Sequence, residues 1–218
     1  MKLTVPLVQA GNRGVAIAGG YAGFCLLYLG ASHLGSREPL LLAPSVLDRA
    51  VPFVPWTVWL YLGQFPLTFL ALWWAADDET RSRTYYAMLA ATLVAFAVFV
   101  AFPTSAERAG VGLPGATGLA YRLLYRVDVP TNCFPSLHVA LAALAAAGLA
   151  AHGRGARAGA IAGAVLIAAS TLTTKQHDLV DVVGGLVVAA GAWSLAGRGL
   201  RYGSRTVDGT RRLPSIPR

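Results

Sequence analysis

Three chemically active side chains lie close together in one short polar segment of the chain: Lys175, His177 and Asp181. His177 and Asp181 are four residues apart, so on a helix they would share a face. The Asp181 carboxylate would then accept the proton of one imidazole nitrogen and leave the other nitrogen free to attack. This spacing predicts that His177 is a nucleophile and that Asp181 orients it. Asp178 follows His177 directly and is predicted to point elsewhere.

A second polar segment carries another histidine, in the run Pro135-Ser136-Leu137-His138. His138 is predicted to protonate the leaving oxygen and later to deprotonate the acceptor. Pro135 can open a helix, because its missing N–H would be unpaired there anyway. The backbone N–H groups of that first turn, near Ser136, would favour an anion.

Positive charge completes this set of groups. Lys175, with arginines from the same side, would neutralise the oxygens of a phosphoryl group as charge builds on them. The arginines concerned, each of which could equally be an anchor at the membrane interface, are Arg108, Arg122 and Arg126. Together these residues predict transfer of a phosphoryl-type group from a phosphate ester to His177.

The elements that must position these side chains are apolar helices. The chain has 218 residues, of which 56% are hydrophobic and 13% charged, and its mean hydropathy is +0.56. A soluble domain rarely has so little charge, and about 20 apolar residues allow one helix to cross the hydrocarbon core. The uncharged stretches are Gly14–Ser32, Ala50–Ala76, Thr84–Ala106, Val129–Ala151, Ala158–Thr174 and Val182–Gly197. We therefore expect an all-α polytopic membrane protein, with a six-helix bundle over residues 1–200 and a basic tail over 201–218.

The distribution of basic residues predicts the orientation of this bundle. With six helices both termini share one side, which carries 12 of the 18 Lys and Arg residues. Basic loops stay in the cytoplasm, so the termini are predicted to be cytoplasmic. One helix down and one helix back separate His138 from His177, so both would lie on the extracytoplasmic face. The net charge of +8 does not indicate nucleic acid, because the arginine-rich tail offers no series of aromatic residues for base stacking and suits anionic lipid better.

Two motifs in these segments resemble those of the type 2 phosphatidic acid phosphatase (PAP2) superfamily. Its motifs read Pro-Ser-x-His and Ser-Arg-x5-His-x3-Asp, and this chain has Pro135 to His138 and Ser170 to Asp181 in the same order. The resemblance is specific over about residues 125–185 and loose elsewhere. It implies a six-helix bundle that works on lipid phosphates without metal or cofactor.

The resemblance also implies a role for each matching residue. His177 would form a phosphohistidine, Asp181 would orient it, and His138 would be the acid and base. Ser136 and Lys175 would bind the phosphate.

The chain departs from the family pattern at two places. Thr171 stands where the second motif has arginine, and Lys175 could replace it only in part, as a point charge without the bidentate fork. The motif Lys-x6-Arg-Pro is absent, and its best substitute is Phe102–Arg108. The second motif, and more weakly the segment Asp48–Tyr61, resemble the branch that contains inositol phosphorylceramide synthases.

Several alternatives remain open from the sequence. The acceptor could be water, as in a phosphatase, or a polar alcohol such as an inositol, as in a headgroup transferase. Polyprenyl, glycerolipid and sphingolipid phosphates are all candidate substrates. Two histidines and an aspartate could bind a metal ion, although Lys175 opposes a cation, and EDTA would test this. A transporter is disfavoured because the polar groups lie at helix ends on one face, without an internal repeat.

Overall fold

The structure is a computed structural model that describes residues 2–34, 38–106, 108–109, 112–128 and 131–203, most of them in helices. The longest helices are α1 (Arg13–Leu34), α5 (Asp78–Ala101), α8 (Arg154–Thr173) and α9 (Leu179–Arg198). The shorter ones are α2 (Val46–Ala50), η1 (Pro55–Thr57), α3 (Val58–Leu62), α4 (Gln64–Trp73), α6 (Gly115–Val127), α7 (Leu137–Leu149) and η2 (Ala150–His152).

Within the described residues, α1, α5, α8 and α9 are long and apolar enough to cross a membrane. The other two predicted spans are shorter. α3 continues into α4, because the Gly63 N–H donates to the Trp59 carbonyl at 3.1 Å, but the pair ends at Trp74. α7 begins only at Leu137, after Ser136 at its N-cap. The bundle is therefore helical and of membrane type, while six full-length spans are not confirmed.

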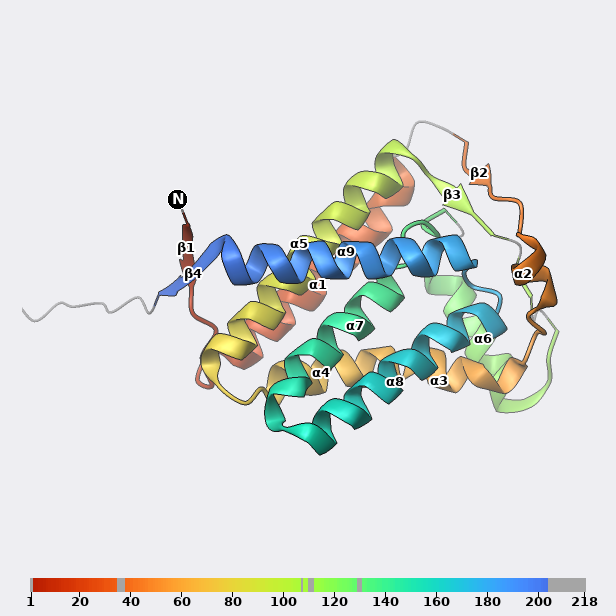
Figure 1. The fold of residues 1–218 in the computed structure, drawn as a ribbon. Coiled ribbons are helices and arrows are strands. Elements are labelled where there is room, and N and C mark those ends of the chain that lie inside the picture. The colour runs from red at the N-terminus through yellow and green to blue at the C-terminus, as the bar shows by residue number, and fades with distance from the viewer. Residues whose placement is uncertain (1, 35–37, 107, 110–111, 129–130, 204–218) are drawn as a thin grey trace, which may run out of the picture.

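The short helix α7 lies at the centre of the bundle, against α4, α5, α8 and α9 (Figure 1). Two glycines allow this close packing. A Cβ atom on Gly148 would lie 2.5 Å from Thr84 Oγ1 on α5, and one on Gly185 of α9 would lie 2.4 Å from the Ser136 carbonyl oxygen. Small residues let helix backbones approach in this way. As a result, the start of α9 lies directly against the start of α7.

Short parallel strand pairs mark the two ends of the bundle (Figure 1). β1 (Leu3–Pro6) pairs with β4 (Leu200–Gly203), so the two ends of the described chain lie side by side. β2 (Leu40–Leu41) pairs with β3 (Thr104–Ser105) at the opposite end, near α2 and α6. The predicted tail begins within β4, and its residues 204–218 lie outside the described residues.

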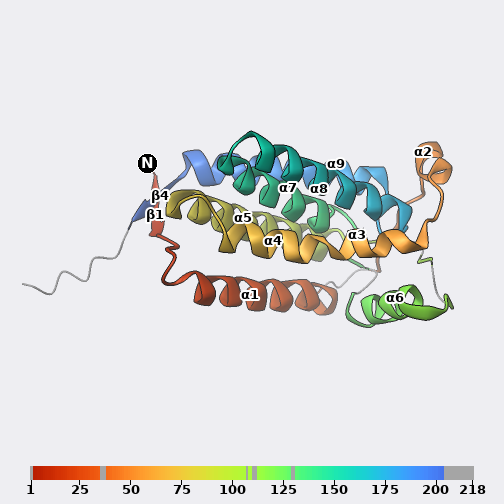
Figure 2. The ribbon, with the colours of Figure 1, turned by 90° about the horizontal axis from the view of Figure 1, so that it is seen from below.

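Helix α1 forms one side of the bundle. It packs against α4 and α5, while α7, α8 and α9 lie on the far side of those two helices (Figure 2). It is also the least buried of the four long helices. α6 lies beyond the end of α1, where Tyr121 is fully buried against Val58 of α3.

Candidate active site

The turn between α8 and α9 places the second polar segment. α8 ends in a Schellman motif, in which the Gln176 N–H donates to the Thr171 carbonyl at 3.0 Å and the Lys175 N–H donates to the Leu172 carbonyl at 3.2 Å. Lys175 takes the left-handed position of this motif, with φ of 57°. Glycine is the usual residue there, and a side chain costs about 1 kcal/mol. A lysine at this position therefore indicates that its side chain contributes an interaction that glycine could not provide.

The Lys175 side chain holds the neighbouring segment in place. Its Nζ donates to the carbonyl oxygens of Asp48 at 2.9 Å and Val51 at 2.6 Å. The Asp48 carboxylate in turn accepts from the Leu179 N–H at 2.8 Å, in the first turn of α9. α2 and the start of α9 are thus joined by charge-assisted hydrogen bonds, and one Lys175 N–H remains for a ligand.

His177 lies outside α9, contrary to the helical spacing expected from the sequence. Asp178 takes the N-cap position, so α9 begins at Leu179 and His177 precedes the helix. His177 nevertheless contacts Asp181, for a reason other than helical spacing. In a reciprocal capping box, the Asp178 side chain accepts from the Asp181 N–H while Asp181 Oδ2 accepts from the Asp178 N–H at 2.9 Å. This cap points the Asp181 carboxylate back towards His177.

The His177 ring and the Asp181 carboxylate form a buried pair. His177 Nδ1 lies 3.4 Å from Asp181 Oδ2, and the two side chains are 9% and 1% exposed. His177 Nδ1 and Asp181 Oδ1 have no hydrogen-bond partner among the described residues. Catalytic hydrogen bonds are often long before a substrate binds. The pairing leaves Nε2 of His177 as the nitrogen that can attack.

Ser136 lies beneath this pair and is fully buried. Its Oγ accepts from the Val139 N–H at 3.3 Å as the N-cap of α7, and its own N–H donates to the Asp181 carbonyl at 3.0 Å. The structure therefore gives Ser136 a clear part in joining α7 to α9.

His138 is fixed by aromatic residues. Its Nε2 lies 2.8 Å from the Tyr61 carbonyl oxygen, so this nitrogen carries a proton. Its ring stacks on the Tyr61 ring at a centroid distance of 3.7 Å and meets the edge of Phe65 at 5.7 Å. Tyr61 lines the cavity described next, whereas His138 is not among the lining residues.

A cavity of about 20 Å³ adjoins His177, with room for about one water molecule. Three of the residues predicted to act on phosphate line it: His177, Lys175 and Arg108. The other lining residues are Tyr28, Tyr61, Ala106, Asp128, Asn132, Cys133 and Gln176. We call this space the catalytic cavity.

Arg108 and Asp128 form an ion pair in the wall of the catalytic cavity. An Arg108 guanidinium nitrogen donates to the Asp128 carbonyl at 2.5 Å and to its carboxylate at 3.3 Å. The guanidinium also lies over the Tyr125 ring at 4.5 Å. Tyr28 donates a hydrogen bond to the same carboxylate. Burial raises the pKa of Asp128, although the Tyr28 hydrogen bond and the charge of Arg108 oppose this rise.

The remaining predicted phosphate ligands are not brought to this cavity. Arg122 and Arg126 lie exposed on α6, where Arg122 donates to the Leu113 carbonyl at 3.2 Å. Thr171, which stands at the arginine position of the motif, donates its hydroxyl to the Ala168 carbonyl within α8. Arg108 is thus the guanidinium that the described chain supplies to the site.

Seven of the ten lining residues were not predicted from the sequence, among them Tyr28, Tyr61 and Asp128. The two tyrosines lie in apolar stretches that gave no signal beyond membrane helices. Asp128 gave a weak signal in the sequence, because it is one of two acidic residues between Pro103 and Pro135, a region with three arginines.

A comparison with known protein families shows which family the chain belongs to. Its residues 38–195 match the model of the PAP2 superfamily, and this range contains His138, His177 and Asp181. No curated protein and no solved structure matches the chain. The match covers well over half of the sequence, so the chain belongs to the PAP2 superfamily, whose members carry out phosphatase-type chemistry.

Proposed function

We propose that the protein is an integral membrane lipid phosphatase or phosphotransferase that acts through a phosphohistidine on His177. The observation that carries this proposal is the buried contact of 3.4 Å between His177 Nδ1 and Asp181 Oδ2, beside a cavity that also holds Arg108 and Lys175. A carboxylate on one imidazole nitrogen makes the other nitrogen a better nucleophile, and the two cations suit a phosphate.

The first half-reaction transfers the phosphoryl group to the enzyme. His177 Nε2 attacks phosphorus, the bond from phosphorus to the lipid oxygen breaks, and His138 gives that oxygen a proton. Arg108 and Lys175 neutralise the phosphoryl oxygens. His138 gains access to the substrate when the Tyr61 ring, which stacks on it and lines the catalytic cavity, moves aside.

The second half-reaction releases the phosphoryl group. His138 takes a proton from the acceptor, the acceptor oxygen attacks phosphorus, and the N–P bond to His177 breaks. The acceptor is water in a phosphatase and the hydroxyl of a polar headgroup, such as an inositol, in a transferase. Both outcomes share the phosphohistidine.

The site faces the extracytoplasmic side in this proposal. The residues that line the catalytic cavity include Arg108 and Asp128, on either side of α6, and Lys175 to His177, between α8 and α9. Figure 1 shows α6 and the start of α9 at the end of the bundle away from the β1–β4 pair, which holds both ends of the described chain. The predicted excess of Lys and Arg on the side of the termini supports a cytoplasmic location for them.

Product analysis tests this function. Purified full-length protein in lipid nanodiscs is incubated with polyprenyl, glycerolipid and sphingolipid phosphates, with and without inositol, and the products are identified by mass. We expect dephosphorylated lipid or a new headgroup ester, unaffected by EDTA and lost in His177→Ala. Turnover retained in His177→Ala, or abolished by EDTA, would refute the proposal.

A further inference from the structure

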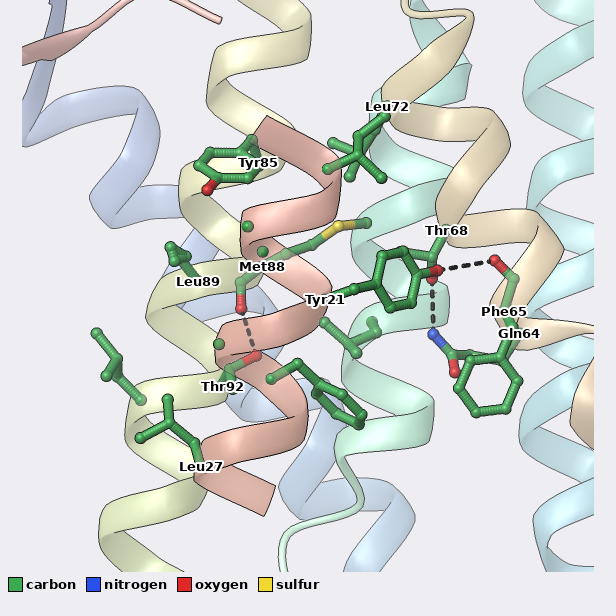
Figure 3. A pocket seen from close by; sticks show the side chains of 17 residues that line it. Tyr21, Leu27, Gln64, Phe65, Thr68, Leu72, Tyr85, Met88, Leu89 and Thr92 are labelled. Carbon is green, nitrogen blue, oxygen red and sulfur yellow. Dashed lines mark hydrogen bonds between the residues drawn. The ribbon is translucent and has the colours of Figure 1, made fainter. Parts of the chain in front are cut away.

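A larger, apolar cavity of about 160 Å³ lies between α1, α4, α5 and α7 (Figure 3). We call it the chain cavity. Most of its wall is hydrocarbon, from side chains such as Leu27, Leu72 and Met88. Its volume is close to that of the engineered apolar cavity of about 150 Å³ that binds benzene. It therefore has room for a hydrocarbon segment of about six carbon atoms.

Several polar side chains in this wall are hydrogen-bonded within the protein. Tyr21 donates its hydroxyl hydrogen to the Phe65 carbonyl at 3.2 Å, and Gln64 Nε2 donates to Thr68 Oγ1 at 2.6 Å (Figure 3). The Thr92 hydroxyl donates to a carbonyl of its own helix, α5, at 2.9 Å. A largely hydrocarbon wall in which these polar groups are already paired suits an apolar occupant rather than an ion or a sugar.

Glycines of α1 create the space. A Cβ atom on Gly23 would meet no atom within 4 Å, and the same holds for Gly19, one turn earlier. Only the third lining glycine, Gly20, lies near a neighbour, with its Cβ position 3.1 Å from the Tyr85 ring. Two of the three lining glycines therefore leave open space where a side chain would otherwise stand, although Gly19 is itself exposed.

The wall of the chain cavity contacts aromatic residues at or next to the catalytic cavity on two helices. Phe24 lines the chain cavity and stacks on Tyr28, which lines the catalytic cavity, at a centroid distance of 5.4 Å. On the other side, Phe65 lines the chain cavity and meets the edge of the His138 ring at 5.7 Å. A molecule with a phosphate at one end and a hydrocarbon chain at the other would follow this path.

We infer that the chain cavity binds the headgroup-proximal part of one hydrocarbon chain of the lipid whose phosphate reaches His177. The inference rests on the proposed function and adds a subsite to it. α1 is long and apolar enough to cross the hydrocarbon core and is the least buried of the long helices, so in a bilayer a lipid chain could enter beside it. Burial of each methylene in the chain cavity strengthens binding about fourfold.

A chain-length series with matched glycine variants tests the subsite. The substrates are monoalkyl phosphates with chains of increasing length, and kcat/KM is measured for the full-length protein in detergent. For the wild type we expect kcat/KM to rise by about fourfold per methylene and to level off after about six carbons. Gly23→Leu and Gly19→Leu fill the space and should remove the rise, while leaving the shortest substrate within about twofold of wild type.

Gly30→Leu is the matched control, because Gly30 also lies on α1 with open space at its Cβ position but does not line the chain cavity. It should keep the full chain-length dependence. Equal loss for short and long substrates in both filling variants, or the same loss in Gly30→Leu, would overturn the subsite.

A binding measurement separates this inference from the proposed function. A monoalkyl phosphate with a diazirine in its chain is photolysed with the protein, and the labelled residues are found by mass spectrometry. Labelling of Leu27, Phe65 or Met88 that falls about tenfold in Gly23→Leu supports the subsite even if no turnover occurs. Labelling spread over the outer faces of the helices, and unchanged in Gly23→Leu, contradicts the subsite even if turnover is observed.

Discussion

Asp181 Oδ2 lies 3.4 Å from His177 Nδ1 and also accepts the N–H of Asp178, the N-cap residue of α9. One carboxylate oxygen therefore both caps a helix and faces the imidazole of His177. The helix holds Asp181 rigidly, with 1% of its side chain exposed, so the direction from which it meets the imidazole is set by the fold. This arrangement distinguishes Asp181 from Asp178, whose side chain caps α9 and has no ion-pair contact with His177 among the described residues.

Asp181→Asn should lower kcat by about 10²–10⁴-fold, because an amide can hold His177 in the wrong tautomer. Asp178→Asn is the matched control, since asparagine is as good an N-cap as aspartate. It should keep kcat within about threefold of wild type. Steady-state kinetics of the two variants on the same lipid phosphate give the comparison, and equal losses would show that Asp181 acts only through the helix.

Lys175 is predicted to have separate effects on stability and on activity. Lys175→Met keeps the left-handed backbone but loses two hydrogen bonds from a charged group, each worth about 1.5–3 kcal/mol. Lys175→Gly loses the same bonds but regains about 1 kcal/mol of backbone strain. Thermal unfolding in detergent should therefore rank wild type above Lys175→Gly and Lys175→Gly above Lys175→Met.

The effects of the two Lys175 variants on substrate binding should not follow the order of their thermal stability. Both Lys175 variants lack the charge beside the catalytic cavity, so both should raise KM for the lipid phosphate by at least about tenfold. A Lys175→Gly variant with normal KM would show that the lysine only joins α2 to α8 and has no part in binding phosphate.

The sequence predicted that His177 and Asp181 would lie together, and the fold brings them to 3.4 Å, but it did not predict their setting. The order and spacing of the two motifs were enough to select this pair, whose chemical roles stay a prediction. The spacing of four suggested a contact across one helical turn. The contact has another origin, because α9 begins at Leu179 with Asp178 as its N-cap, and His177 lies before the helix. The pairing of Lys175 with Asp48 joins residues 127 apart, and no local pattern indicates it.

Asp128 is predicted to compete with the substrate for Arg108. Its carboxylate accepts from the guanidinium at 3.3 Å, and the catalytic cavity beside it has room for only about one water molecule. A phosphate must displace this carboxylate or find it protonated. Asp128→Asn should therefore lower KM for the lipid phosphate several-fold, by about 1 kcal/mol of binding free energy, with little change in kcat.

The pH dependence of KM provides the control for this competition. Because burial raises the pKa of Asp128, lowering the pH towards that value neutralises the carboxylate in the free enzyme and frees Arg108. KM of the wild type should fall as the pH decreases, relative to KM of Asp128→Asn measured in parallel. A higher KM in Asp128→Asn would mean that Asp128 positions Arg108 instead of competing for it.

Asp48 should make stability sensitive to acid. Burial raises its pKa, but hydrogen bonds from Ser45 and from the Leu179 N–H outweigh this and hold the pKa below the usual 3.8. A carboxyl whose pKa is lowered by folding stabilises the protein above its unfolded pKa, and that contribution is lost as the pH falls through the folded value. Unfolding measured below about pH 4 should show this loss in wild type and not in Asp48→Asn. An identical acid profile in the two proteins would contradict the assigned role.

The helices illustrate a second limit of the sequence. Apolar stretches predicted the positions of α1, α5, α8 and α9 well, because a long uncharged run allows few other structures. The fourth apolar stretch ran from Val129 to Ala151, and Pro135 was expected to open its helix; α7 begins at Leu137, with Ser136 as its N-cap. The packing of α7 against α4, α5, α8 and α9 could not be read from hydropathy. The stacking of Tyr61 on His138 also depends on this packing, which explains why neither tyrosine of the site was found.

The most direct test of the account is the detection of phosphate on His177 during turnover. Full-length protein is mixed with a lipid phosphate labelled with radioactive phosphorus, quenched in alkali within the first turnover, digested and sequenced by mass spectrometry. We expect an alkali-stable, acid-labile phosphate on the peptide that contains His177, absent in His177→Ala and longer-lived in His138→Ala. Turnover without any such peptide, or with the phosphate on another residue, would contradict it.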